Sequence, residues 1–391
     1  MVVRSQASVF AEGVVNTYLS SAQEALKEQY RNFAAQSVAP VAASLESHAK
    51  DLKEVLQEIA QKGYLGINVP REYGGQSLGL LPLVLFVEAV SCFEPGLGLT
   101  LSNHAAVIEL LKRFGTGSQK SRYLPALARG EGFGTLAFSE ENAGVDFSAV
   151  ASRIEKSGNK ITCTGKKTLV VSGDFATLVV VLARLGDKDG DLGLYLSEVQ
   201  DSKACRVQAR RAISGLSSAH INDMEFEDFP IEEGGQLIGA SAGQMALYAL
   251  DVAKTVLAGA AVGLSEAAIA SAVDHARKRT QFGVNIGQFQ GIQWKLADME
   301  VAATGAKLQT YRAAWSHEGD LSNFARHAAM CKLVATNAAR FISSESASVL
   351  ATCALDSNHP LTRFLRDARA LEICLGTAEF QKMLLVSELA I

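Results

Sequence analysis

Residues 277–299, RKRTQFGVNIGQFQGIQWKLADM, close one helical pattern and open another. The basic cluster at the start suits a helix C-terminus, where the helix dipole favours cations. Phe282 and Gly283 interrupt the periodicity, and apolar residues then return at helical spacing. The pattern predicts two helices joined by a tight turn that presents Arg279 and Gln290 outward. An ordinary helix hairpin with a charged tip has the same periodicity, so the pattern alone assigns no function.

Composition and charge exclude several classes of protein. The chain has 391 residues, of which 48% are hydrophobic and 20% charged, enough to bury a large core divided into two or three substructures. The formal net charge of −4, without a long Lys/Arg run, argues against a nucleic-acid partner. No leader pattern and no run of about 18 apolar residues stand out, so we expect no membrane span and a cytoplasmic location. The cysteines are scattered without a C-x-x-C pair, which predicts reduced thiols and no metal site.

Apolar periodicity divides the chain into three parts. Residues 1–130 carry helical patterns, one of them over residues 103–114, and predict an N-terminal all-α domain. Residues 131–236 contain segments that alternate in β-forming residues between loop residues, which predicts a middle β-domain. Helical patterns return in residues 237–391 and predict a C-terminal bundle. The expected fold class is α+β, mainly α.

The motif R-T-Q-F-G at residues 279–283, followed by L-A-D-M at residues 296–299, resembles a signature of the acyl-CoA dehydrogenases. The order of helices, β-domain and four-helix bundle is similar to that family over nearly the whole chain. In the family, the arginine and the residues after it reach across a subunit interface to the FAD of a neighbouring chain. The resemblance therefore implies FAD contacts for Arg279, Phe282 and Gln290 and an oligomer, with a tetramer favoured. A guanidinium suits a pyrophosphate because it donates hydrogen bonds in pairs and stays charged.

The resemblance also implies a reaction, the FAD-linked α,β-dehydrogenation of an acyl-CoA or acyl-carrier thioester. This chemistry needs a carboxylate that removes the α-proton. Residues 376–381, GTAEFQ, resemble the family's E-G-T-x-x-I-Q segment, but Leu375 stands where the glutamate is usual. A subset of the family carries the base on the helix near residues 251–254, where this chain has Ala253. Hydrocarbon side chains cannot accept a proton, so we assign no catalytic residue.

Two other carboxylates are weaker candidates for the base. Asp251 is displaced from Ala253 on the same helical pattern, and catalysis tolerates little misplacement. Glu94 lies in the turn F-E-P-G, where we expect a solvated carboxylate. By their position in the resemblance, Asp251 and Lys254 are expected near the pantetheine of the thioester.

The expected flavin contacts are only partly kept. Residues 138–146, FSEENAGVD, resemble the family's T-E-P-x-A-G-S-D loop, which binds flavin and phosphate. Ser139 and Gly144 keep the pattern, as does Thr377 in the C-terminal motif, and all three are expected to contact the cofactor. Val145 has lost the hydroxyl of the family's serine.

Two further flavin segments are altered. Residues 165–173, GKKTLVVSG, resemble G-x-K-x-W-I-T-N-G, with Leu169 and Val171 in place of the tryptophan and threonine. An aliphatic pair packs against a ring but cannot tune its electronics. The glycine loop offered to a neighbour's cofactor is also replaced, and added methyl groups block the close approach of backbone to phosphate. The residues at that loop are Ser348, Ala351, Thr352 and Ala354.

Three functions stay open from the sequence. The first is the base-lacking subunit of a heteromeric acyl-CoA dehydrogenase, whose homologous sister subunit carries the glutamate and the intact flavin loops. The second is a homo-oligomeric flavoenzyme of the same fold with a different base or oxygenase chemistry. The third is a thioester-binding scaffold without redox chemistry. The acyl chain and the electron acceptor are not determined by the sequence.

Overall fold

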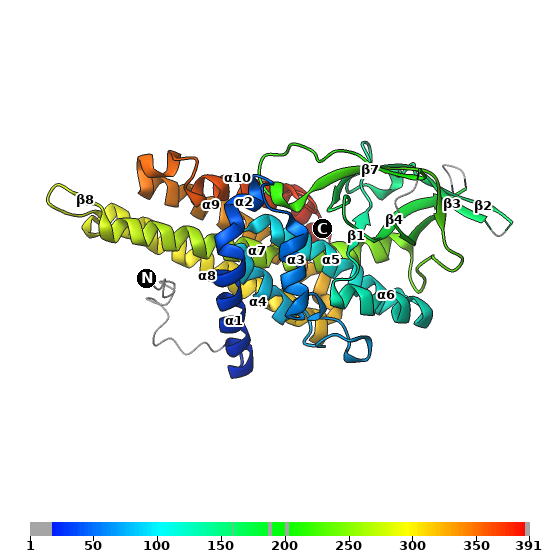
Figure 1. Cartoon of the computed structure of the whole chain (residues 1–391). Helices are drawn as coiled ribbons and strands as arrows, with labels where there is room; N and C mark the ends of the chain where they lie inside the picture. The colour runs from blue at the N-terminus through cyan, green and yellow to red at the C-terminus, as the bar shows by residue number, and fades with distance from the viewer. Residues whose placement is uncertain (1–17, 159, 187–189, 200–202, 388–391) are drawn as a thin grey trace.

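The chain forms helices, then a sheet, then helices again (Figure 1). The computed structural model describes residues 18–158, 160–186, 190–199 and 203–387. The predicted α+β class, mainly α, is confirmed. The domain boundaries drawn from the sequence stay predictions.

Local capping signals start several N-terminal helices. At the start of α1, the Ser20 side chain accepts from the Gln23 N–H and the Gln23 side chain accepts from the Ser20 N–H, which makes a capping box. Thr116 and Gln119 repeat the device at α6. The elements are α1 (Ser21–Phe33), η2 (Ala34–Val38), η3 (Ala39–Val41), α2 (Ala42–Glu46), α3 (Leu52–Gln61), η4 (Tyr64–Gly66), η5 (Arg71–Tyr73), α4 (Leu80–Ser91), α5 (Pro95–Phe114) and α6 (Gly117–Arg129).

Helix α5 begins at Pro95, well before Asn103, where the apolar pattern placed its start. Proline suits the first helical position, and the Glu94 carboxylate caps the helix by accepting from the Gly96 N–H at 3.3 Å. Every residue from Pro95 to Leu111 is buried. A helix buried on all sides has no polar face, so one-sided periodicity could not mark its first turns.

The middle of the chain is a mixed sheet in the strand order β1-β4-β2-β3-β7-β6, with β5 added on β4. Strand β4 pairs in parallel with β1 and β2 and antiparallel with β5. The β-forming segments read from the sequence lie at residues 161–164, 177–182, 192–196 and 222–226, so β1, β2 and β6 were not predicted. Strand β1 is buried throughout and β2 buries a single side chain, so neither alternates. The strands are β1 (Gly134–Ala137), β2 (Arg153–Ser157), β3 (Lys160–Val171), β4 (Leu178–Leu185), β5 (Leu192–Glu198), β6 (Cys205–Val207) and β7 (Ile221–Ile231).

The C-terminal part is a bundle of long helices with a hairpin at one end (Figure 1). Helix α7 packs against α4 with almost no space between the two backbones. A Cβ atom on Gly259 would lie 3.0 Å from the Val84 carbonyl oxygen, and one on Gly263 would overlap the Glu88 carbonyl. The elements are α7 (Ala242–Lys278), β8 (Thr280–Gln281), β9 (Val284–Asn285), η8 (Ile286–Gln288), α8 (Gln290–Gly319), η9 (Leu321–Asn323), α9 (Phe324–Leu350), η10 (Ala351–Leu355), α10 (Pro360–Ile373) and α11 (Ala378–Ser387).

Helix α7 is long and apolar enough to cross a membrane by length and composition alone. In the fold, 67% of its most apolar window is buried among the other helices. Packing in the bundle therefore accounts for its apolar character.

Candidate active site

Leu375 lies in the tight connection between α10 and α11 and is half-buried, with a backbone φ of +57°. This left-handed conformation is uncommon for a residue other than glycine. Lys332 holds the connection from α9, because its ammonium group donates to the carbonyl oxygens of Glu372 (2.6 Å) and Gly376 (3.0 Å). Burial, aided by nearby Lys254, lowers the pKa of Lys332 to about 8. The connection is thus rigidly supported, and the side chain it presents is a hydrocarbon.

The second base position lies on α7, where Ala253 is fully buried. Lys254, which is 0% exposed, makes an ion pair of 2.6 Å with Asp251. Its ammonium group also lies 3.5 Å from Oε1 of Gln381 on α11. Burial raises the pKa of Asp251, while the Lys254 charge acts to lower it. Asp251 and Lys254 therefore bind each other, and their predicted contact with a thioester stays a prediction.

Glu94 is not the solvated turn carboxylate that the sequence suggested, because it is only 1% exposed. One oxygen accepts from the Ser218 hydroxyl at 2.8 Å, and the other lies 3.4 Å from the Arg363 guanidinium. Burial raises the pKa of Glu94, and Arg363 opposes the shift. The Glu94 side chain thus links α5 to the β-domain and to α10, so it connects all three parts of the chain.

The loop that carries Ser139 and Gly144 is held by a buried ion pair that the sequence analysis did not single out. Lys167, buried in β3, contacts the Glu140 carboxylate at 2.6 Å. The same carboxylate accepts from the Ala151 N–H at 2.7 Å and the Ser152 hydroxyl at 2.7 Å. The glutamate of the T-E-P-like motif and the lysine of the G-x-K-like motif were the signals that could have identified this pair.

Two of the positions expected to contact flavin, Leu169 on β3 and Val145 in the loop after β1, present exposed hydrocarbon, whereas Val171 is buried. Leu169 is 55% exposed with a φ of +55°, and Val145 is 45% exposed. The Leu169 N–H donates to Asp223 at 3.3 Å, and Arg211 is bonded to the same carboxylate through two nitrogens. This surface can pack against a flat ring. The polar groups beside it, the Leu169 N–H, Arg211 and Asp223, are already bonded to one another.

Three other predicted cofactor residues lie at the opposite end of the molecule. Arg279 ends α7, Phe282 forms the tip of the β8–β9 hairpin, and Gln290 begins α8. Figure 1 shows this hairpin projecting beyond the bundle on the side away from the sheet, and Ser139 follows strand β1 of that sheet. Phe282 is 93% exposed. One chain therefore does not bring its own sheet loops and hairpin into a single site.

Two other predicted positions fall at helix ends. Thr377 caps α11, since its hydroxyl accepts from the Phe380 N–H at 3.4 Å. The replaced glycine loop follows α9, where Ala351 has a φ of +52° and a ψ of −127°. That combination is suited to glycine, so the backbone keeps a glycine conformation although the side chain is alanine.

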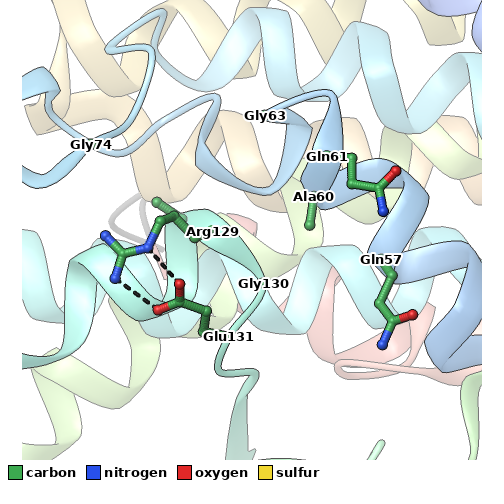
Figure 2. A pocket seen from close by; sticks show the side chains of 9 residues that line it. Gln57, Ala60, Gln61, Gly63, Gly74, Arg129, Gly130 and Glu131 are labelled. Carbon is green, nitrogen blue, oxygen red and sulfur yellow. Dashed lines mark hydrogen bonds and ion pairs between the residues drawn. The ribbon is translucent and has the colours of Figure 1, made fainter.

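A groove of about 490 Å³ lies elsewhere, between the ends of α3 and α6 (Figure 2). Gln57 and Gln61 line it from α3, and Arg129 and Glu131 line it from the other side. Figure 2 shows the arginine and the glutamate joined by two hydrogen bonds, of 2.8 and 2.7 Å. Because these charges satisfy each other and none of the predicted site residues lines the groove, we assign it no chemistry.

Comparison with known proteins identifies the family. Three family models match this chain: the acyl-CoA dehydrogenase N-terminal domain at residues 20–131, the middle domain at 135–229 and the C-terminal domain at 243–390. The chain belongs to the acyl-CoA dehydrogenase family. Acyl-CoA dehydrogenases are FAD-linked oxidoreductases that act on acyl-CoA thioesters and form oligomers.

Individual relatives match over nearly their whole length. The short-chain specific acyl-CoA dehydrogenase of Clostridium acetobutylicum is 29% identical over 94% of this chain and 97% of that protein. The acryloyl-CoA reductase (NADH) of Anaerotignum propionicum is 30% identical over 95% of each protein. The structure of butyryl-CoA dehydrogenase from Megasphaera elsdenii superposes with a TM-score of 0.91 at 26% identity, covering 95% of this chain and 99% of that one.

Membership of the acyl-CoA dehydrogenase family implies FAD as the cofactor. Leu169, Val171 and Val145, at positions expected to contact it, carry side chains without a hydrogen-bond donor or acceptor. By the same resemblance, Ala351 and Thr352 replace glycines whose backbone the cofactor is expected to approach. The loss of these flavin contacts stays a prediction.

Proposed function

We propose that the chain is the base-lacking subunit of a heteromeric acyl-CoA dehydrogenase that oxidises an acyl-CoA thioester. The observation that carries the proposal is the hydrocarbon at both base positions, Leu375 and Ala253. The losses at the flavin positions Leu169 and Val171 point the same way, because base and cofactor contacts are missing together. A homologous sister subunit would supply the glutamate and the flavin loops.

The contribution of this chain to such a complex is its hairpin. Arg279, Phe282 and Gln290 keep the family motif and lie together at a projecting end of the molecule. The exposed hairpin is placed to reach a neighbouring subunit, and the guanidinium of Arg279 suits a cofactor pyrophosphate. The chain would then complete its partner's flavin site without completing its own.

Co-expression with a homologous open reading frame beside its gene tests this proposal. The chain purified alone should be colourless, and the co-purified complex should be yellow and should oxidise an acyl-CoA. Arg279→Gln should lower the flavin content of the complex, whereas Arg153→Gln, an exposed arginine on β2, should leave it unchanged. Full flavin occupancy in the chain purified alone would refute the proposal.

A second candidate is a homo-oligomeric flavoenzyme that uses Asp251 as its base. The observation in its favour is that burial raises the pKa of Asp251, as a general base near neutral pH requires. This function predicts that the chain alone is yellow, that an acyl-CoA bleaches its flavin band without oxygen, and that Asp251→Asn prevents the bleaching. Acyl-CoA binding without flavin in any preparation would instead support a thioester-binding scaffold.

A further inference from the structure

The turn between α8 and α9 encloses a cavity of about 270 Å³ that is unrelated to the positions discussed above. Three of its residues carry cationic or titratable nitrogen, and one carries a carboxylate. The lining residues are Arg312, Asp320, Asn323, Arg326, His327 and Met330.

The two arginines of the cavity have no anionic partner in the part of the chain that the structure describes. Arg312 on α8 and Arg326 on α9 are both exposed, and neither forms an ion pair or hydrogen bond with any residue that the structure describes. The single carboxylate, Asp320, is already engaged, because Ser322 donates to one oxygen at 2.8 Å and Asn323 donates to the other at 2.8 Å. The cavity therefore has an excess of positive charge with free donors.

His327 supplies a third nitrogen group. Its side chain is 7% exposed, and its buried Nδ1 has no hydrogen-bond partner. Burial lowers the pKa of His327, and the charges of Arg312 and Arg326 add to the effect against the opposing charge of Asp320. A buried imidazole without a partner is costly unless a ligand or water satisfies it.

The same cavity lies at the positive end of a long helix. Helix α9 spans 27 residues, and no side chain caps its N-terminus. Asn323, the residue at the cap position, uses its amide for Asp320 instead. An uncapped helix N-terminus attracts anions through the helix dipole.

We propose that this cavity is a binding site for a phosphate group, held between Arg312 and Arg326 with His327 as a further donor. Guanidinium forks pair with phosphate oxygens through two bonds each, and the phosphate charge would balance the unpaired arginines. The group can be inorganic phosphate or the phosphate of a nucleotide, since both present the same oxygens. The site does not depend on the function proposed above.

Calorimetric titration of the full chain tests the site with two probes, inorganic phosphate and adenosine 3′,5′-bisphosphate, at constant ionic strength set with chloride. Binding should be saturable with one site per chain. Arg312→Gln and Arg326→Gln should each weaken it by about tenfold or more, the typical effect of losing one charge-assisted bond. Arg153→Gln on β2, which makes the same change of charge at a distance, should bind like the wild type.

The results of the titration distinguish free phosphate from a nucleotide as the ligand, and they also show whether the site exists. Equal affinity for both probes identifies free phosphate as the ligand, and a preference for the bisphosphate identifies a nucleotide. Urea unfolding in chloride should be unchanged in the arginine variants, because both side chains are exposed, so weaker binding would not reflect misfolding. The proposal is overturned if neither probe binds, or if the arginine variants bind as tightly as Arg153→Gln.

Discussion

Asp367 on α10 shares one cation with a second buried acid. Its Oδ1 accepts from the Leu216 N–H at 2.6 Å, while its Oδ2 lies 3.9 Å from the Arg363 guanidinium and has no hydrogen-bond partner. Arg363 also faces Glu94, at 3.4 Å. Burial, and then the charge of Glu94, raise the pKa of Asp367 to about 8. A single guanidinium thus serves two buried carboxylates and also lies 3.8 Å from the partly exposed Glu46, and the proton held by Asp367 reduces the repulsion among these acids.

Asp367→Asn should stabilise the protein at alkaline pH and have little effect in acid. The folded state holds the proton up to about pH 8, whereas the unfolded state releases it near the ordinary value of 3.8, so stability falls as pH rises between these values. Asparagine keeps an oxygen for Leu216 and carries no charge. We expect a gain on the order of a few kcal/mol above pH 8 that shrinks toward pH 5, measured by urea unfolding across this range.

The control for this prediction is Asp191→Asn, a change at an exposed aspartate that should show no such trend. A difference between Asp367→Asn and the wild type that is the same at every pH would mean that Asp367 is not protonated in the folded protein.

The pair of Lys254 and Asp251 predicts strong coupling between two substitutions. Lys254→Met should destabilise the fold by roughly 3–5 kcal/mol, because it leaves a buried carboxylate without its cation. Adding Asp251→Asn should recover most of that loss, since no charge then stays buried. A double-mutant cycle measured by chemical unfolding checks the coupling, and additive effects would show that the two groups do not depend on each other.

Among the helices, the contact between α4 and α7 is set by glycine. Gly263 faces the Glu88 carbonyl so closely that a methyl group would overlap it, and Gly259 faces Val84 with little more room. Because the obstacle is backbone, it cannot rotate away as a side chain would. The two helices can therefore approach only where α7 lacks a Cβ atom.

Gly263→Ala should cost about 3 kcal/mol, because α4 and α7 must move apart and lose packing. Gly305→Ala is the matched control, since this exposed glycine inside α8 has no atom within 4 Å of the added methyl group. It should raise stability by about 0.5–1 kcal/mol through helix propensity. Both are measured by urea unfolding, and equal effects of the two changes would show that the close contact is unimportant.

In the molecule as a whole, the hairpin and α8 present apolar side chains that the chain itself does not cover. Phe282, Trp294 and Val301 are exposed large hydrophobic residues on this side of the bundle. Large exposed apolar side chains mark surfaces where another chain binds. Acyl-CoA dehydrogenases form oligomers, and an oligomer interface would cover such a surface. We propose a tetramer for this chain or its complex.

Phe282→Asn should weaken assembly without weakening the fold. The side chain is almost fully exposed, and its φ of +53° is a conformation that asparagine adopts more readily than phenylalanine. We expect sedimentation velocity to show a shift toward smaller species, while the midpoint of thermal unfolding at low concentration stays the same or rises. Unchanged sedimentation would exclude the hairpin tip from the interface.

Local sequence patterns were sufficient for much of the fold. The helical periodicity of apolar residues, the break at Phe282 and the β-forming segments between loop residues depend on neighbouring residues, so the order of helices, sheet and helices was predicted correctly. Motif spacing also located Leu375 and Ala253, because their identity can be read without any knowledge of contacts. Whether these positions make the chain dependent on a partner stays a prediction.

Other features arise from residues far apart in the chain and could not be read locally. The start of α5, the burial of Glu94 and the pairing of Lys167 with Glu140 depend on which surfaces meet when the three parts pack together. The separation of Arg279 from Ser139 is of the same kind, since the length and direction of α7 set it. Burial is a property of the assembled core, and it alone decides which charges lose water and must find partners.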